Sequence, residues 1–104
     1  MQVIVALIVA MFLAYPVAQP ADQYVCRKNE AAYQHALREC QIMAKRKRVY
    51  HALGCAKGAR YSGVGMSYGT KPRHCYSKMD SNRLIARAYV RSASGAHYWS
   101  AHYR

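Results

Sequence analysis

The sequence LIARAYVR-SASGA-HYWSAHY, at residues 84–103, has the form of a β-hairpin. Two runs of alternating side chains, at 84–91 and 97–103, flank a segment of Ser, Ala and Gly that is typical of a turn. We therefore predict two antiparallel strands with two different faces. The apolar face is expected to hold Leu84, Ala86, Ala88, Val90, Trp99, Ala101 and Tyr103. The other face is expected to hold Arg87, Tyr89, Arg91, Tyr98, His102 and Arg104.

An amphipathic helix is predicted upstream, at about residues 29–47. Asn29 is a suitable N-cap, and Glu30 is well placed for the positive end of the helix dipole. Apolar residues then recur at steps of three and four. They are Ala32, Tyr33, Ala36, Leu37, Cys40, Met43 and Ala44. The helix ends in a basic run, Lys45, Arg46, Lys47 and Arg48, and cations suit the C-terminal end of a helix dipole.

The segment between helix and hairpin predicts two smaller elements. Residues 61–67 alternate and read as a short strand, with Gly63 and Gly65 on a face that something can approach closely, most often a packed helix. Residues 70–80 suggest a short helix with Pro72 in its first turn. Together these elements predict an α+β fold, stapled by disulfides, with a small antiparallel sheet covered on one face.

Charge divides the chain into two parts. Residues 3–14 are all apolar, whereas all 16 Lys and Arg follow from Arg27 onward, against only 4 Asp and Glu, for a net charge of +12. We predict a signal peptide or weak membrane anchor at residues 1–21 and a small basic domain at 22–104. A signal peptide cleaved after Ala18 or Ala21 implies a secreted or periplasmic protein. A retained anchor, with Arg27 and Lys28 behind it, could face the domain inward.

Four cysteines, Cys26, Cys40, Cys55 and Cys75, are the candidate disulfide partners. In an oxidising compartment they would form two disulfides, which a domain this small would need as staples. A continuous helix separates Cys40 from Cys26 and argues against that bond. The pairings Cys26–Cys55 with Cys40–Cys75, or Cys26–Cys75 with Cys40–Cys55, both remain open.

The strong positive charge favours an anionic partner: lipopolysaccharide, anionic lipid or nucleic acid. The candidate binding residues are Lys45, Arg46, Lys47, Arg48, Arg87, Tyr89, Arg91, Tyr98 and Arg104. Arg and Tyr interleaved on one sheet face can pair with phosphates and stack on bases or sugars. A solvated helix end and an ordinary polar strand face are the simpler interpretations of the same residues.

Enzymatic and metal-binding interpretations are weaker, and we assign no catalytic residue, metal or cofactor. The segments Lys28-Asn29-Glu30-Ala31-Ala32 and Gln34-His35 resemble the opening helix of pancreatic-type ribonucleases, but the rest of the chain departs from that family and none of its roles is carried over. In a ribonuclease-like enzyme or toxin, His35 would be the general base, Lys71 the cation that stabilises the phosphate and His102 the general acid. His51, Cys55, His74 and Cys75 make a poor ligand set for a tetrahedral ion.

Several short motifs carry a further resemblance. They are Gly54-Cys55-Ala56-Lys57-Gly58, the Gly63-Val64-Gly65-Met66-Ser67 strand, His74-Cys75-Tyr76, and a C-terminal segment with Trp99, Tyr103 and Arg104. In these motifs the chain resembles small exported cysteine-containing proteins of bacteria and their phages. The resemblance implies export and a Cys55–Cys75 pair, although a second cysteine often adjoins the one matching Cys75 in those proteins. They have no established activity to transfer.

Three functions follow as expectations. The first is an exported, non-catalytic basic protein that binds an anionic polymer or envelope surface. The second is the secreted ribonuclease-like enzyme or toxin. The third is a membrane-anchored phage accessory protein that acts at the host envelope.

Overall fold

The computed structural model describes residues 20–104 and confirms the α+β class. Its elements run in the order η1 (Pro20–Tyr24), α2 (Glu30–Arg46), β1 (Tyr61–Ser67), η2 (Ser81–Arg83), β2 (Leu84–Arg91) and β3 (His97–Tyr103). Within residues 20–104 there is no helix long and apolar enough to cross a membrane. The predicted signal peptide or anchor lies almost entirely outside the described residues.

The helix α2 begins and ends where its sequence predicts. The Asn29 side chain accepts a hydrogen bond from the Ala32 N–H at 3.0 Å, so the N-cap is confirmed. Ala36, Cys40 and Met43 share the buried stripe. The last turn closes at Lys47, which adopts the left-handed conformation (φ 54°) and donates its N–H to the Ala44 carbonyl.

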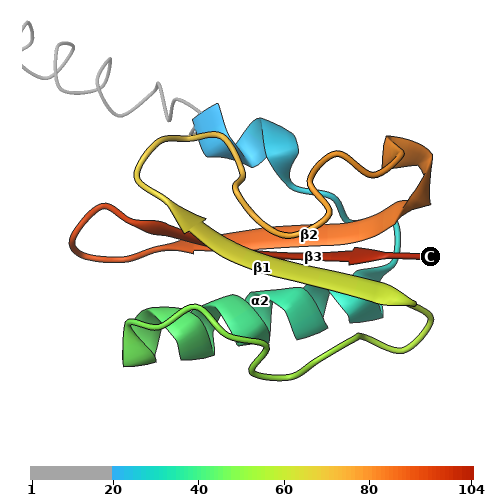
Figure 1. The fold of residues 1–104 in the computed structure, drawn as a ribbon, viewed down its shortest axis with the longest axis horizontal. Coiled ribbons are helices and arrows are strands. Elements are labelled where there is room, and N and C mark those ends of the chain that lie inside the picture. The colour runs from blue at the N-terminus through green and yellow to red at the C-terminus, as the bar shows by residue number, and fades with distance from the viewer. Residues whose placement is uncertain (1–19) are drawn as a thin grey trace, which may run out of the picture.

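The sheet has the order β1-β3-β2, with both neighbours antiparallel to the central β3. Figure 1 shows α2 on one side of it, and η1 with the loop of residues 68–80 on the other. All seven residues of β3 are buried because both of its faces are covered. This differs from the predicted sheet covered on one face only.

The predicted division of the hairpin faces is wrong. Val90 stands opposite Tyr98, and Ala86 opposite His102, so both polar rings lie on the face that packs on α2. Trp99 lies instead beside Tyr89 on the other face. The seven-residue β3 is therefore displaced by one position from the predicted pairing, which exchanges its two faces.

The glycine face of β1 receives a loop, and not the expected helix. A Cβ on Gly63 would lie 2.0 Å from the Cys75 carbonyl oxygen, and one on Gly65 would lie 1.8 Å from that of Arg73. The backbone of β1 therefore packs directly against the backbone of the loop of residues 68–80. The predicted short helix at 70–80 is also wrong: those residues form turns, and one turn of 3-10 helix, η2, follows them.

The structure contains no disulfide among the four cysteines, all of which are described. Cys40 lies on the buried face of α2, with its thiol 3.4 Å from the Ala88 carbonyl oxygen. Cys26 lies beside β2 and is half-buried, whereas Cys55 and Cys75 are exposed. The predicted staples are therefore absent from this structure, and packing on both sheet faces holds the fold together.

Candidate functional site

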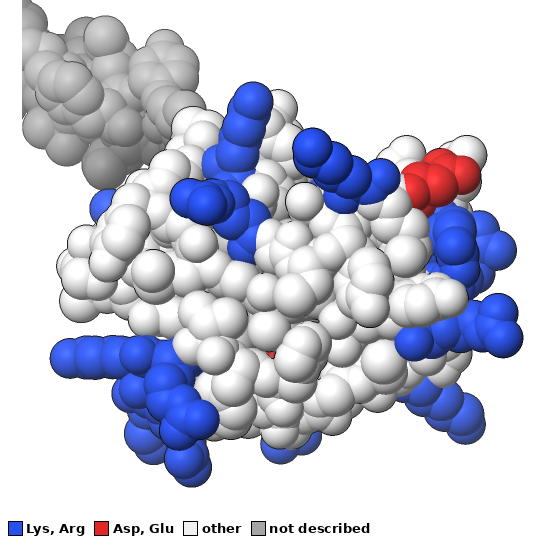
Figure 2. All heavy atoms as spheres, viewed as in Figure 1, with Lys and Arg blue, Asp and Glu red and all other residues white. Residues whose placement is uncertain are grey.

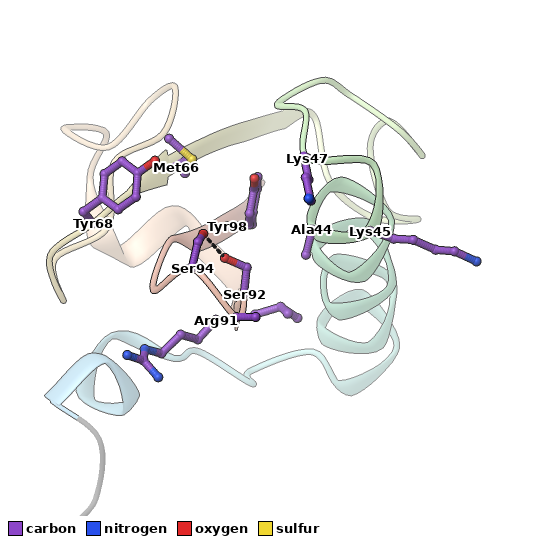
Figure 3. A pocket seen from close by; sticks show the side chains of 11 residues that line it. Ala44, Lys45, Lys47, Met66, Tyr68, Arg91, Ser92, Ser94 and Tyr98 are labelled. Carbon is purple, nitrogen blue, oxygen red and sulfur yellow. Dashed lines mark hydrogen bonds between the residues drawn. The ribbon is translucent and has the colours of Figure 1, made fainter.

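A groove of about 730 Å³ lies where three elements end together: the last turn of α2, the end of β1 and the β2–β3 turn. Figure 3 shows the side chains that line it. The lining residues are Ala44, Lys45, Lys47, Met66, Tyr68, Val90, Arg91, Ser92, Ala93, Ser94 and Tyr98. The groove therefore brings together residues from the predicted basic run and from the predicted hairpin face.

The floor of the groove is apolar because the sheet face beneath it belongs to the core. Met66 stands opposite Tyr98, and Val90 flanks Tyr98 on the other side. Tyr98 is only 5% exposed and packs in the same cluster as Met43 and Val64. The floor is thus a continuation of the core that α2 does not cover.

The rim is polar and cationic. In Figure 3 the Lys47 side chain extends toward the groove, whereas Lys45 and Arg91 point away from it. Ser92 and Ser94 hydrogen-bond to each other at 2.9 Å across the hairpin turn. No acidic side chain lines the groove.

The basic run of residues 45–48 is exposed at this end of the molecule. The space-filling view shows a dense group of Lys and Arg at the lower left, where α2 ends in Figure 1 (Figure 2). Arg48 lies over the Tyr50 ring at 4.8 Å, a cation–π contact. The remaining cations project elsewhere around the periphery of this face.

Few of these charges are neutralised. Arg27 is the only Lys or Arg of residues 20–104 that forms an ion pair with an acidic side chain, that of Glu30. Asp80 caps η2, and Glu39 is buried. The positive surface therefore arises both from the excess of Lys and Arg and from acids engaged in other contacts.

Arg87 and Tyr89 do not present a free binding face. Arg87 donates hydrogen bonds to His74 Nε2 at 3.1 Å and to the Tyr103 hydroxyl at 3.4 Å. Tyr89 donates to the carboxylate of Asp22 in η1 and packs against Trp99. Burial, with the added effect of Asp22, raises the pKa of Tyr89 to about 12. Both side chains connect the sheet to the layer above it.

Arg104 lies at the opposite end of the sheet from the groove. Its guanidinium donates to the Asn82 carbonyl at 2.6 Å, and Arg83 beside it lies over the Tyr61 ring at 5.1 Å. The nine predicted binding residues therefore separate into three places: the groove end, the covered sheet face, and this far end.

A buried polar network, which the sequence did not reveal, joins α2, β3 and the loop before β1. Glu39, Ser100 and His102 have no exposed surface. Ser100 donates to a Glu39 carboxylate oxygen at 2.7 Å, and the Leu53 N–H donates to the other at 2.9 Å. His102 Nδ1 accepts the Ala56 N–H at 3.2 Å, so its proton is on Nε2, 3.0 Å from Ser100 Oγ.

This network binds loop residues and is closed to substrate. Burial disfavours the charged form of Glu39, but the His102 ring, whose Nε2 lies 3.7 Å from the carboxylate, and hydrogen bonds from the Leu53 N–H and Ser100 outweigh it and lower its pKa to about 2. The sequence does contain one signal that Glu39 is buried, which is its helical spacing from apolar residues. Glu39 follows Ala32 and Ala36 at helical intervals on the buried stripe.

The residues of the enzymatic and metal interpretations are dispersed. His35 does meet His102, with ring centroids 5.2 Å apart, but Lys71 belongs to the loop on the opposite face of the sheet. His51 contacts Ser62, and His74 accepts from Arg87. No group of three metal-ligating side chains occurs among residues 20–104.

No protein family, curated protein or solved structure matches this chain.

Proposed function

We propose that this chain is an exported, non-catalytic basic protein that binds an anionic polymer or envelope surface. The observation that carries the proposal is the uncompensated charge: 16 cations, of which only Arg27 has an acidic partner within residues 20–104. Cations without partners raise the local concentration of anionic ligands and accelerate their association. Lipopolysaccharide, anionic lipid and nucleic acid all carry the required charge.

The groove end is the main contact surface in this proposal. It combines the exposed basic run with the groove residues Lys47 and Tyr68. Arg104 and Arg83 form a second cationic area at the far end of the sheet. Arg87 and Tyr89 support the fold and are not part of the binding surface, because their polar atoms bond to other parts of the protein.

Export and disulfide formation belong to the same proposal. An oxidising compartment would allow the cysteines to pair, and the exposed Cys55 and Cys75 would be the first to react. The intact mass of the protein recovered from medium or envelope, before and after reduction and alkylation, tests both parts. A mass without the leader and thiols that react only after reduction support the proposal. A full-length mass with four free thiols contradicts it.

Binding is tested with two variants that remove the same charge. Lys45→Gln/Lys47→Gln changes the groove end, whereas Lys57→Gln/Lys78→Gln changes exposed lysines elsewhere. We measure binding to heparin and to phosphatidylglycerol vesicles at low salt. The groove-end variant is expected to lose about tenfold more affinity than the control, as for two local phosphate contacts. Equal losses would mean that net charge alone drives binding, and no binding by the unmodified protein would refute the proposal.

A further inference from the structure

We propose that the groove binds a single anionic amphiphile: a phosphate or carboxylate head beside Lys47 and an alkyl chain along the floor formed by Met66, Val90 and Tyr98. This inference rests on the proposed function and makes it more specific. A polymer or surface needs only exposed charge, whereas a concave site with an apolar floor selects one molecule.

The shape and lining of the groove fit an alkyl chain. Its volume of about 730 Å³ falls within the usual range of small-ligand sites, roughly 300–1,000 Å³. Met66 has a flexible, polarisable side chain that adapts to an irregular apolar ligand. Ala44 on α2 is small and leaves space above the floor.

A nucleobase fits the same lining less well. Stacking requires the open face of an aromatic ring. Tyr98 is only 5% exposed and therefore offers little ring surface, which leaves Tyr68, 72% exposed, as the one available platform in the groove. A single ring at the rim does not explain an apolar floor.

The charge at the rim complements an anionic head. The backbone N–H groups of Lys47 and Arg48 already bond to carbonyls of the last helical turn, at 3.3 and 3.1 Å. The Lys47 ammonium is therefore not needed to cap those carbonyls, and it extends toward the groove (Figure 3).

The test is titration of the full chain with dodecyl phosphate below its micelle concentration, followed by calorimetry and by amide NMR shifts. Lys47→Gly removes the ammonium, and glycine suits the left-handed conformation at this position, so the variant keeps its fold. Met66→Gln removes the apolar contact. The matched controls are Lys57→Gln and Met79→Gln, whose side chains lie outside the groove.

We expect one molecule bound per chain, shifts concentrated at groove residues, and about tenfold weaker binding in each groove variant. The affinities of the two control variants should stay within about twofold of the affinity of the unmodified protein, because their changed side chains do not contact the ligand. Inorganic phosphate and neutral dodecyl maltoside should each bind much more weakly, since each supplies half of the ligand.

Several outcomes would overturn the inference. Unchanged affinity in Lys47→Gly would do so even if Met66→Gln failed to fold. Equal binding of dodecyl maltoside would remove the role of charge, and equal binding of phosphate would remove that of the floor. If only a single-stranded oligonucleotide bound, the site would be a nucleic-acid contact. Heparin and vesicle binding that survives any of these results would leave the proposed function intact.

Discussion

Glu39 is expected to make the stability of the protein depend on pH. It is a fully buried carboxylate whose pKa falls from 4.5 to about 2 because donors from β3 and from the loop before β1 surround it. Since the folded-state pKa lies below the unfolded one, the stabilisation is complete above about pH 4.5 and is lost as the pH falls toward 2. The whole change amounts to roughly 3 kcal/mol of unfolding free energy.

Urea unfolding of the unmodified protein and of Glu39→Gln, between pH 2 and 7, measures this effect. We expect Glu39→Gln to be less stable at neutral pH, because an amide cannot accept all the hydrogen bonds that the carboxylate accepts. The difference between the two proteins should shrink as the pH falls below about 4.5. Glu30→Gln is the control, since Glu30 is exposed on the same helix. Parallel pH profiles for the unmodified protein and Glu39→Gln would show that Glu39 does not act as described.

Among the helices and strands, the sequence predicts correctly those features that neighbouring residues determine. The cap of Asn29 and the apolar period define α2 to within about a residue at each end, and the turn residues at 92–96 define the hairpin. The pairing of β3 is different. Because all seven of its residues are buried, alternation carries no information about which face meets α2. Tyr98 and His102 were misplaced for this reason.

Only the part of the candidate site that depends on local sequence was predicted. Exposed charge is visible in a sequence, so residues 45–48 were found. The groove depends on α2, β1 and the hairpin turn ending at one place, which no local pattern encodes. The roles of Arg87 and Tyr89 depend on η1 and the loop of residues 68–80, whose position over the sheet follows from contacts distant in sequence.

The contact between β1 and the loop of residues 68–80 gives a prediction at this scale. Gly65→Ala places a Cβ against the Arg73 carbonyl, so the loop must move away from the sheet. We expect a loss of several degrees in Tm, with a cost of about 1–3 kcal/mol typical of an overpacked site. Trypsin should also cleave faster after Arg73 and Lys78. Gly69→Ala, where a Cβ meets nothing within 4 Å, is the control. Equal stability and cleavage of the two variants would contradict this close approach.

At the scale of the whole molecule, the charge that favours an anionic partner must also oppose folding. The chain carries a net charge of +12, and only one Lys or Arg of residues 20–104 pairs with an acidic side chain. Unfolding moves these cations apart, so their repulsion destabilises the folded state most when salt is low. The screening length falls from about 30 Å at 0.01 M salt to about 8 Å at 0.15 M.

We therefore expect added salt to stabilise the protein, whereas a protein held by surface ion pairs would lose stability. If screening of this repulsion raises the free energy of unfolding by about 1 kcal/mol, the Tm of a domain this small would rise by about 4–8 °C. Thermal unfolding in sodium chloride between 0.01 and 0.15 M measures the effect, and sodium sulfate at equal ionic strength separates screening from anion binding. Screening depends on ionic strength alone, so a larger rise in sulfate at these low concentrations would indicate a bound anion. A Tm that falls with salt would mean that attraction between surface charges outweighs their repulsion.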